Sequence, residues 1–393
     1  MSAVRAGYKQ TEVGVIPEDW AVTPLGNLTI LMTNGFVGTV KQHYSENESG
    51  VLYIQGYNVQ ENSFDFHGIK YVTDEFHKAH QKSCLRGGDL LTVQTGDVGL
   101  TTMVPDELAG SNCHALIISR FDKKRSSPGF FSYYLNSAPG RSRLRLIETG
   151  TTMKHLNVGD VLEFLVPQPP TKAEQEAIAE ALSDADALIE SLEQLLAKKR
   201  HLKQGAMQEL LTGKKRLPGF SGEWEVKRLG DVLTICHGKS QHAVEDRNGC
   251  YPILATGGRI GTANHYLYDK PSVLIGRKGT IDEPQYMDTP FWSVDTLFYS
   301  TIHEPNCAKF LFYRFCLIGW KQHNEASGVP SLNAKTIERI EVAMPRSEEQ
   351  AAIAATLTDI DAEITELESQ LAKARALKQG MMQKLLTGEI RLL

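Results

Sequence analysis

One stretch of the sequence occurs twice: Glu174-Gln-Glu-Ala-Ile-Ala-Glu-Ala-Leu182 returns as Glu349-Gln-Ala-Ala-Ile-Ala-Ala-Thr-Leu357. The match continues without a gap to Arg216-Leu217 and Arg391-Leu392, at a constant offset of 175 residues. About 28 of the 44 aligned positions are identical, far more than helical composition alone would produce in register. The chain of 393 residues therefore contains a duplicated segment, and such an internal repeat organises the rest of the fold.

Both copies have the apolar spacing of a coiled-coil helix. Apolar residues recur at alternating steps of four and three, which places them on one helix face. This face, the seam, comprises Ile178, Leu182, Ala185, Ile189, Leu192 and Leu196 in the first copy and Ile353, Leu357, Ile360, Ile364, Leu367 and Leu371 in the second. Antiparallel pairing of the two copies is the simplest interpretation. Pairing of each copy with a second chain in a homodimer is the alternative.

Proline and glycine mark the expected limits of the two helices. Each helix has about 40 residues and would extend for roughly 60 Å. Gly205 and Gly380 lie beyond the seam and predict a bend. The expected starts are Pro169-Pro170-Thr171 and Pro345, and the expected ends are Thr212-Gly213 and Thr387-Gly388.

The segments outside the repeat also correspond, though more loosely. Glu18-Asp-Trp20 matches Gly222-Glu-Trp224, and Gly88 to Gly96 aligns with Pro271 to Gly279. Near the ends of these segments, Gly150 with Leu156-Asn157 aligns with Gly328 and Leu332-Asn333. Two related domains therefore alternate with the two helices.

Short apolar runs bounded by Gly, Asn and Asp predict strands in both domains. The runs are 51–54, 90–93, 115–118, 251–254 and 272–275, and helices are expected at 130–135 and 308–318. The predicted fold class is α+β, with two β-rich mixed domains separated by two long helices in an antiparallel coiled coil and a pseudo-two-fold internal repeat. The expected segments are a domain at 1–170, a spacer helix at 171–217, a domain at 218–345 and a spacer helix at 346–393.

Composition excludes several classes of protein. A net charge of −5, from 42 Lys and Arg against 47 Asp and Glu, disfavours a basic nonspecific nucleic-acid coat but leaves room for local basic faces. The six cysteines form no CxxC pair, and His77, His80 and Cys84 lack a fourth ligand, so no metal site is expected. No apolar run approaches the roughly 20 residues of a membrane-spanning helix, and the first twenty residues lack the apolar core of a secretion signal. The expected compartment is the cytoplasm.

Further motifs surround the repeat and complete a recognisable set. They are Tyr8-Lys-Gln-Thr-Glu-Val-Gly14-Val-Ile-Pro17-Glu-Asp-Trp20, the helix entries at 174–182 and 349–357, Leu202-Lys-Gln-Gly-Ala-Met-Gln-Glu-Leu-Leu-Thr-Gly213 with its second copy, and Arg216-Leu-Pro-Gly-Phe220. With these motifs the chain resembles the specificity subunits of type I restriction-modification systems over essentially its whole length.

The resemblance implies a DNA-reading subunit that is not itself an enzyme. Each variable domain would read one half of a bipartite target in double-stranded DNA. The helices would hold the domains at a fixed separation and dock two methyltransferase subunits, which would methylate adenine N6 with S-adenosylmethionine. Two restriction subunits, where present, would add a nuclease that requires ATP and magnesium. No cofactor is expected in this chain itself.

The residues themselves offer no catalytic motif. The sequence has no GxxxxGK loop followed by Ser or Thr, which ATP hydrolysis would need. Asp282-Glu-Pro-Gln-Tyr286 lacks the second proline of the Asn/Asp-Pro-Pro-Tyr element of adenine methyltransferases, and Ala255 to Gly261 is a Gly-rich turn. The alternative function is a non-catalytic coiled-coil scaffold whose β-rich ends bind proteins or glycans.

Basic and hydroxyl side chains on the predicted loops are the candidates for DNA contact, because they pair with phosphates and base edges. In the first domain they are Lys123, Lys124, Arg125, Arg141, Arg143, Arg145, Thr151, Thr152 and Lys154, and in the second they are Lys239, Arg259, Arg277, Lys278 and Lys321. A solvated surface charge is the alternative for any one of them.

The helices carry charges of both signs outside the seam. Their carboxylates, which include Asp186 and Asp361, would repel phosphate and are expected to face solvent or protein. Basic residues toward the helix ends, such as Lys199, Lys203 and Lys378, are expected to interact with the helix dipole or with DNA.

Overall fold

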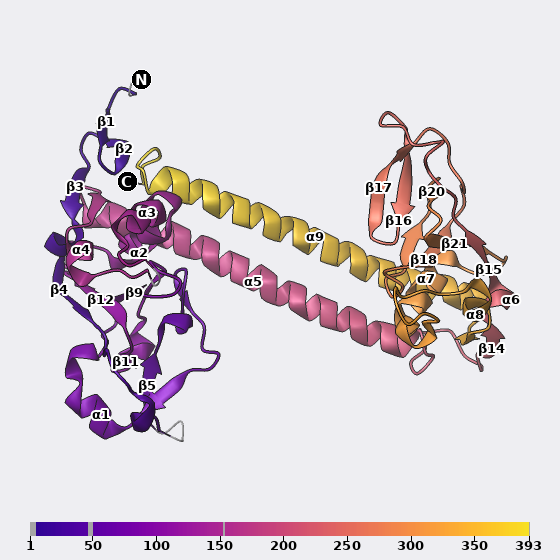
Figure 1. The fold of residues 1–393 in the computed structure, drawn as a ribbon, viewed down its shortest axis with the longest axis horizontal. Coiled ribbons are helices and arrows are strands. Elements are labelled where there is room, and N and C mark those ends of the chain that lie inside the picture. The colour runs from indigo at the N-terminus through magenta and orange to yellow at the C-terminus, as the bar shows by residue number, and fades with distance from the viewer. Residues whose placement is uncertain (1–4, 46–49, 152–153, 393) are drawn as a thin grey trace. The chain divides into compact units, whose positions relative to one another are not determined.

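The structure, a computed structural model, describes residues 5–45, 50–151 and 154–392. The chain forms two compact units. The first unit joins Met1–Ser191 to Leu371–Leu393, and the second comprises Leu192–Gln370. Helices α5 (Lys172–Leu210) and α9 (Ser347–Leu385) each run through both units (Figure 1). The boundaries between the units thus fall inside α5 and α9, whereas the sequence predicted each helix as a segment of its own.

The first unit consists of short strands and short helices around its share of α5 and α9. Its strands are β1 (Tyr8–Thr11), β2 (Gly14–Pro17), β3 (Ala21–Pro24), β4 (Thr29–Asn34), β5 (Val51–Ile54), β6 (Val59–Gln60), β7 (Ser63–Phe64), β8 (Lys70–Val72), β9 (Leu90–Val93), β10 (Thr101–Met103), β11 (Asn112–Cys113), β12 (Leu116–Phe121) and β13 (Leu165–Gln168). Its short helices are α1 (Asp74–Ala79), α2 (Pro128–Asn136), α3 (Ala138–Leu144) and α4 (Val158–Leu162).

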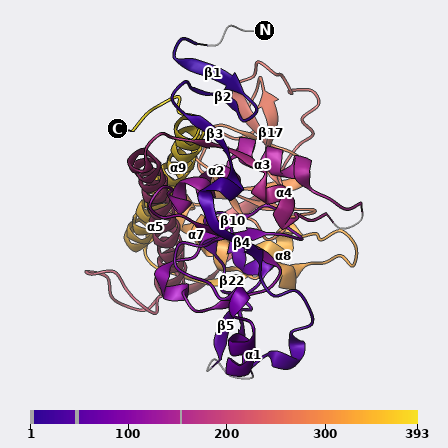
Figure 2. The same ribbon diagram turned by 90° about the vertical axis from the view of Figure 1, so that its left-hand side faces the viewer.

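An antiparallel sheet in the order β10–β9–β12–β4 forms the centre of the first unit. Because side chains alternate between the faces of a strand, neighbouring residues enter different cores. Leu90 and Ile117 pack with α2 and the first turns of α5, whereas Leu91 and Ile118 pack with β5 and β11 on the other face. Strands β1 and β2 lie at one end of this unit, and α1 and β5 lie at the other (Figure 1, Figure 2).

The second unit has a similar inventory of elements. Its strands are β14 (Glu225–Arg228), β15 (Leu233–His237), β16 (Tyr251–Ala255), β17 (Gly258–Ala263), β18 (Ser272–Gly276), β19 (Gln285–Met287), β20 (Trp292–Ser293), β21 (Leu297–Ile302) and β22 (Glu341–Met344). Its short helices are α6 (Leu229–Val232), α7 (Ala308–Leu317) and α8 (Ala334–Glu338).

The second unit repeats the plan of the first. Its central sheet has the order β15–β21–β18–β19. Val273 and Ile275 pack with α7 and the first turns of α9, and Leu274 packs with β16 on the opposite face. The predicted strands at 90–93 and 272–275 are thus the buried centres of two related sheets, and the α+β fold with an internal repeat is confirmed.

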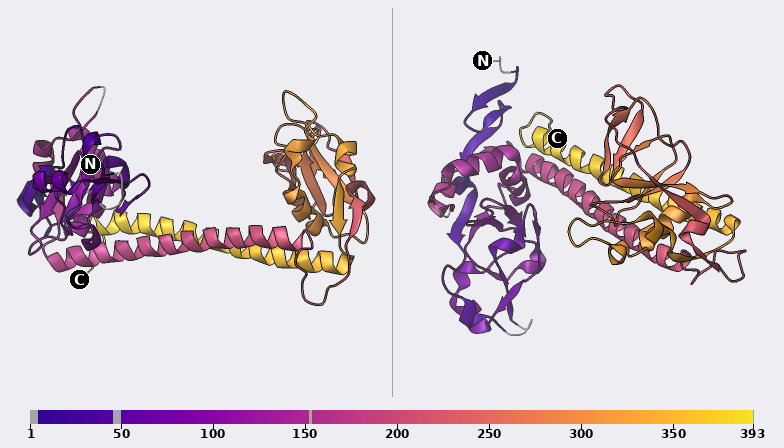
Figure 3. Two further views of the ribbon diagram at one scale, coloured as in Figure 1. Left: turned by 90° about the horizontal axis from the view of Figure 1, so that it is seen from below. Right: turned by 45° about the vertical axis from the view of Figure 1, so that its right-hand side comes forward.

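Within each unit the two long helices are antiparallel neighbours (Figure 1, Figure 3). In the first unit, Ile178 of α5 shares a core cluster with Leu385 of α9. In the second unit, Leu210 of α5 shares a cluster with Ile353 of α9. Of the seam, Ile178, Leu182, Leu196, Ile353, Leu357, Ile364 and Leu371 are buried, and Ala185, Ile189, Leu192, Ile360 and Leu367 are half-buried. One chain supplies both partner helices, so antiparallel pairing is confirmed.

Ion pairs also join the two helices. Asp186 and Lys378 approach to 2.6 Å in the first unit, and in the second the pairs are Lys199–Glu363, Arg200–Glu368 and Lys203–Asp361, at 2.5, 2.6 and 2.5 Å. Basic residues that the sequence assigned to the helix dipole or to DNA therefore bind carboxylates of the neighbouring helix. Such partly exposed pairs specify the direction of pairing more than they add stability.

The segment after each long helix folds back onto the start of the other repeat. Arg391 binds both oxygens of Glu174, with Nη2 2.8 Å from Oε2, and also Asp19 at 3.0 Å. Arg216 binds Glu349 in the same way, with Nη2 2.6 Å from Oε2. The side chains of both glutamates are 2 % exposed, and a buried carboxylate needs such a partner. We call each arrangement an Arg–Glu clasp.

The long helices end slightly before the predicted stops, at Leu210 and Leu385. Gly213 and Gly388 follow with φ of +73° and +69°, the left-handed conformation that commonly closes a helix. A Cβ atom on Gly388 would lie 2.5 Å from Pro17, so only glycine fits there. Both helices continue through Gly205 and Gly380 without a break, where the sequence predicted a bend.

Candidate nucleic-acid interface

The ends of two strands meet at one edge of the first sheet. Asn34, the last residue of β4, pairs with Ile117, and Val93, the last residue of β9, pairs with Leu116. Because Leu116 and Ile117 are neighbours, the segments that follow β4 and β9 leave the sheet at the same edge.

A third segment is hydrogen-bonded to this edge. The Leu156 amide donates to the Gln94 carbonyl at 3.1 Å, and the Gln94 side-chain amide donates to the Leu156 carbonyl at 2.8 Å. His155 forms bridges with Thr95 and with Thr149. Residues 34–38, 94–97, 149–151 and 154–156 therefore form one surface, which we call the loop edge of the first unit.

The second unit has an equivalent loop edge, made of residues 237–240, 277–280 and 324–331. Strands β15 and β18 both end there, since His237 and Ile275 pair with the same residue, Phe298. The Leu332 amide donates to the Arg277 carbonyl at 3.0 Å, which matches the bond from Leu156 to Gln94. The two motif pairs that the sequence aligned are thus brought together in both units.

Cations gather at the loop edge of the second unit. A pocket of about 400 Å³ is lined by the three cations Arg277, Lys278 and Lys335, with Glu325 as its one carboxylate. Both predicted residues, Arg277 and Lys278, are exposed, and Arg277 Nη1 donates to the Asp295 carbonyl at 3.1 Å, which orients the guanidinium group. Lys239 is exposed at the end of β15. Lys335 was missed by the sequence analysis, although it stands two residues after the aligned Leu332-Asn333 pair.

The loop edge of the first unit is less basic. Thr151 and Lys154 are exposed, and Lys154 Nζ lies 3.2 Å from a Glu148 oxygen. Thr152 lies outside the described residues. Neutral hydrogen-bonding groups thus dominate here, in contrast to the second unit.

A smaller pocket opens where β4 ends. Its volume is about 330 Å³, and Asn34, Phe36, His80 and Lys82 line it. Asn34 Oδ1 is buried and has no hydrogen-bond partner in the described part of the chain, which is costly for a polar atom. His80 and Phe76 stack with ring centres 4.1 Å apart, and His80 Nδ1 donates to the Phe76 carbonyl at 2.8 Å. The sequence offered no signal for this pocket, because its walls come from separate segments.

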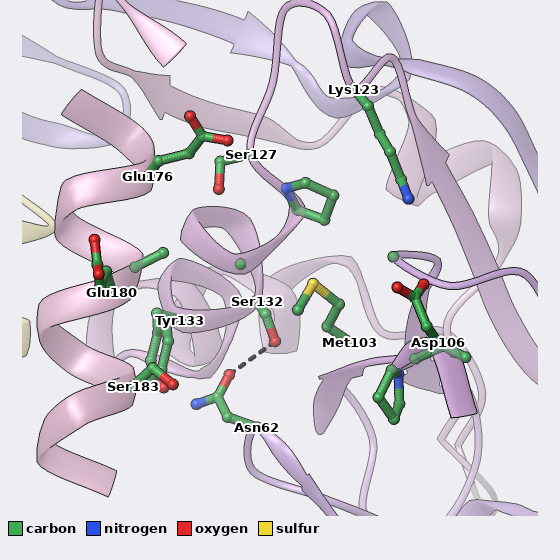
Figure 4. Close-up of a pocket in the computed structure, with 16 residues that line it drawn as sticks. Asn62, Met103, Asp106, Lys123, Ser127, Ser132, Tyr133, Glu176, Glu180 and Ser183 are labelled. Atoms are coloured by element: carbon green, nitrogen blue, oxygen red, sulfur yellow. Dashed lines mark hydrogen bonds between the residues drawn. The ribbon is translucent and has the colours of Figure 1, made fainter. Parts of the chain in front are cut away.

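Lys123, Lys124 and Arg125 lie away from the loop edge. They follow β12, whose last residue Phe121 pairs with Thr29 at the opposite end of the sheet. Lys123 donates to the Gly87 carbonyl at 2.7 Å and lines a pocket of about 630 Å³ between α2 and α5. Figure 4 shows Glu176 and Glu180 on the helix side of this pocket and Asp106 near Lys123. These carboxylates would repel phosphate, so this pocket is a poorer DNA surface than the loop edge.

The three arginines of the α3 region do not form one exposed patch. Arg143 Nη1 donates to Tyr134 Oη at 2.9 Å and to the Leu165 carbonyl at 2.6 Å, and its guanidinium group lies 4.7 Å from the centre of the Phe164 ring. Burial raises the pKa of Tyr134, which Arg143 partly opposes. Arg141 and Arg143 are half-buried, and of the three only Arg145 is exposed. The hydrogen bonds of Arg143 stabilise the fold of the first unit.

The remaining candidates of the second unit lie on its surface. Arg259 is exposed on β17, and its Nε donates to the Gly261 carbonyl at 3.3 Å. Lys321 Nζ lies 2.7 Å from Asp282 Oδ2; the hydrogen bond between them lowers the pKa of Asp282 and raises that of Lys321. Lys321 is thus paired, whereas the guanidinium group of Arg277 and the ammonium group of Lys278 line the pocket.

Neither a metal centre nor a membrane span is found in the part of the chain that the structure describes. No three of its His, Cys, Asp or Glu side chains are placed to hold a metal ion. His77 and His80, which the sequence paired with Cys84, instead bind Asn112 and the Phe76 carbonyl. Among the described helices, none is both long and apolar enough to span a membrane.

Two long stretches of the chain match one known family. Residues 17–198 and 221–374 both match the family model of the type I restriction modification DNA specificity domain. The chain belongs to this family. Each of the two specificity domains contains one central sheet and one loop edge.

Individual relatives agree with the two-domain match. The chain is 26 % identical to the MjaX type I restriction enzyme specificity subunit of Methanocaldococcus jannaschii over 98 % of this chain and 96 % of the relative. It is 20 % identical to the MjaIX specificity subunit of the same organism, again over 98 % and 96 %.

A solved structure has the same fold. The crystal structure of the type I restriction-modification S subunit from M. genitalium superimposes with a TM-score of 0.67 at 18 % identity, covering 93 % of this chain and 96 % of that one. A chain from a study of complex assembly in the type I R-M system gives a TM-score of 0.53 at 18 % identity, covering 95 % and 99 %.

Proposed function

We propose that this chain is the sequence-reading subunit of a type I restriction-modification complex, in which each loop edge contacts one half of a bipartite DNA target. The supporting observation is that both specificity domains build the same hydrogen-bonded loop edge and equip it with different side chains. Gln94 and Arg277 occupy equivalent backbone positions there. An amide and a guanidinium group select different base edges, since amides pair with adenine and arginine with guanine.

The partners follow from the same proposal. The antiparallel helices α5 and α9 would set the separation of the half-sites and dock two methyltransferase subunits, with two restriction subunits joining where the system cleaves DNA. S-adenosylmethionine, ATP and magnesium would be bound by those partners. Arg143, Lys321 and the ion-paired helix lysines would serve the fold and would not read DNA.

Single-molecule methylation sequencing of genomic DNA tests the proposal. Cells with the gene, cells without it and cells carrying an Arg277→Ala, Lys278→Ala variant are compared. We expect one bipartite motif to lose N6-methyladenine in the deletion strain. In the variant, we expect the base requirement to become less strict in only one half of that motif. An unchanged methylome in cells that express the chain beside an active methyltransferase would instead support the coiled-coil scaffold.

A further inference from the structure

A tyrosine of the first specificity domain meets both long helices at one point. Tyr133 of α2 donates its hydroxyl to Asp186 Oδ2 of α5 at 2.8 Å. Lys378 Nζ of α9 lies 2.6 Å from the other oxygen of Asp186 and 5.9 Å from the centre of the Tyr133 ring. Figure 4 shows Tyr133 facing α5 beside Ser183. Three elements are therefore joined at a single carboxylate.

The second specificity domain has the same arrangement. Tyr313 of α7 donates to Asp361 Oδ2 of α9 at 2.7 Å, and Lys203 Nζ of α5 lies 2.5 Å from Oδ1. Lys203 also lies 5.8 Å from the centre of the Tyr313 ring. Asp186 and Asp361 are equivalent in the repeat, as are Lys203 and Lys378, so each site takes its Asp from one copy and its Lys from the other. We call these two sites the tyrosine joints.

The joints add direction to an otherwise apolar contact. Tyr133 is 6 % exposed and Tyr313 is fully buried, and burial raises the pKa of both hydroxyls, which keeps them neutral donors. Lys378 Nζ also lies 3.9 Å from Glu61 Oε1. Apolar packing is non-directional, whereas a hydrogen bond weakens steeply when its angle or length changes. Helix α2 therefore cannot slide along the long helices without breaking its hydrogen bond to Asp186, and the same holds for α7 and Asp361.

We propose that the two tyrosine joints are positioning devices that restrict the chain to one spacing between its DNA half-sites. This inference rests on the proposed function. One additional base pair moves the next half-site by about 3.4 Å and turns it by about 34°, given about 10.5 base pairs per turn. A domain held by directional bonds to both helices resists that shift and rotation, whereas one held by apolar packing alone is free to tilt.

The test uses the complex of this chain with its methyltransferase subunits. A DNA library carries both half-sites separated by every spacer length around the natural one, and sequencing reads methylation of each member. We expect the wild-type complex to methylate one spacer length. For Tyr133→Phe and Asp186→Asn, we expect methylation of spacers one base pair longer or shorter to rise about tenfold relative to the natural spacer, as loss of one hydrogen bond to a charge implies. The variants should still recognise the same two half-site sequences as the wild type.

Matched variants separate positioning from folding. Lys378→Arg keeps the ion pair and should retain wild-type spacing. Lys199→Met breaks the Lys199–Glu363 pair, which joins α5 to α9 and includes no residue of α2 or α7. This variant should not broaden the range of spacer lengths that are methylated. If Tyr133→Phe and Asp186→Asn lower methylation of all spacers equally, the joints are merely structural and the inference is wrong. If the wild-type complex methylates no bipartite motif, the proposed function fails first, and the inference fails with it.

Discussion

The two loop edges share one backbone arrangement but carry different side chains. Arg277 and Lys278 line a pocket in the second specificity domain, while the first presents the exposed hydroxyl of Thr151 and the half-buried amide of Gln94. Cations bind phosphate and guanine, whereas amides prefer adenine. The two halves of the target should therefore differ in base composition.

At the residue scale, Arg277→Ala combined with Lys278→Ala should weaken binding of the second half-site by about 1–3 kcal/mol. The slope of affinity against salt should also fall, by about one for each phosphate that the variant no longer neutralises. Fluorescence anisotropy on duplexes with one scrambled half-site measures both effects. Lys123→Ala combined with Lys124→Ala, at the opposite end of the first sheet, removes the same number of positive charges; it is the matched control and should change little. Equal effects for the two double variants would show that net charge alone governs binding.

Buried tyrosines should make the protein sensitive to alkali. Burial raises the pKa of Tyr53, Tyr133 and Tyr313 well above the usual range, and raises that of Tyr299 to about 12. The unfolded chain releases these protons near pH 10, before the folded chain does, so stability is intact below about pH 10 and falls as the pH rises above it. Urea unfolding across this range measures the loss. Tyr313→Phe should flatten the pH dependence, and a constant urea midpoint in the wild type would contradict this account.

At the scale of elements, a glycine inside α5 and a glycine just after α9 have opposite requirements. Gly205 lies inside α5 with open space around its Cα, so Gly205→Ala should stabilise the protein by about 0.5–1 kcal/mol. Gly388 has a positive φ and no room for a Cβ, so Gly388→Ala should destabilise it by more than about 1 kcal/mol. Chemical denaturation of the two variants provides the comparison. A stabilising Gly388→Ala would disprove the close approach to Pro17.

The sequence predicted elements well where one local pattern determines them. The heptad seam predicted α5 and α9, and uniform apolar runs predicted β9 and β18, because burial on both faces leaves no alternation to misread. It could not predict that Arg143 turns inward, since its acceptor, the Leu165 carbonyl, is 22 residues away. The tyrosine joints were equally hidden, because each combines residues of three distant elements.

At the scale of the whole molecule, the Arg–Glu clasp of the first unit joins the last residues of the chain to Glu174 and Asp19. Arg391→Met would leave the Glu174 carboxylate buried without its partner. We expect a loss of about 2 kcal/mol, less than the roughly 3–5 kcal/mol typical of a buried pair, because the Arg391 side chain is 27 % exposed. Hydrogen exchange should accelerate at residues 14–24 and in the first turn of α5. Lys384→Met, which removes a half-exposed pair with Glu389, is the control.

The first unit is built from two separate segments of the chain, and this affects how it folds during synthesis on the ribosome. Residues 192–370 are contiguous and emerge together, whereas the segment up to Ser191 is completed only by Leu371–Leu393. At about 5–20 residues per second, some 200 further residues take roughly 10–40 s to translate. During that delay Ile178 and Leu182 lack the C-terminal part of their apolar surroundings. The first unit therefore begins to be synthesised before the second but can complete its fold only after it. Chaperones or partner subunits that bind early can act during that interval.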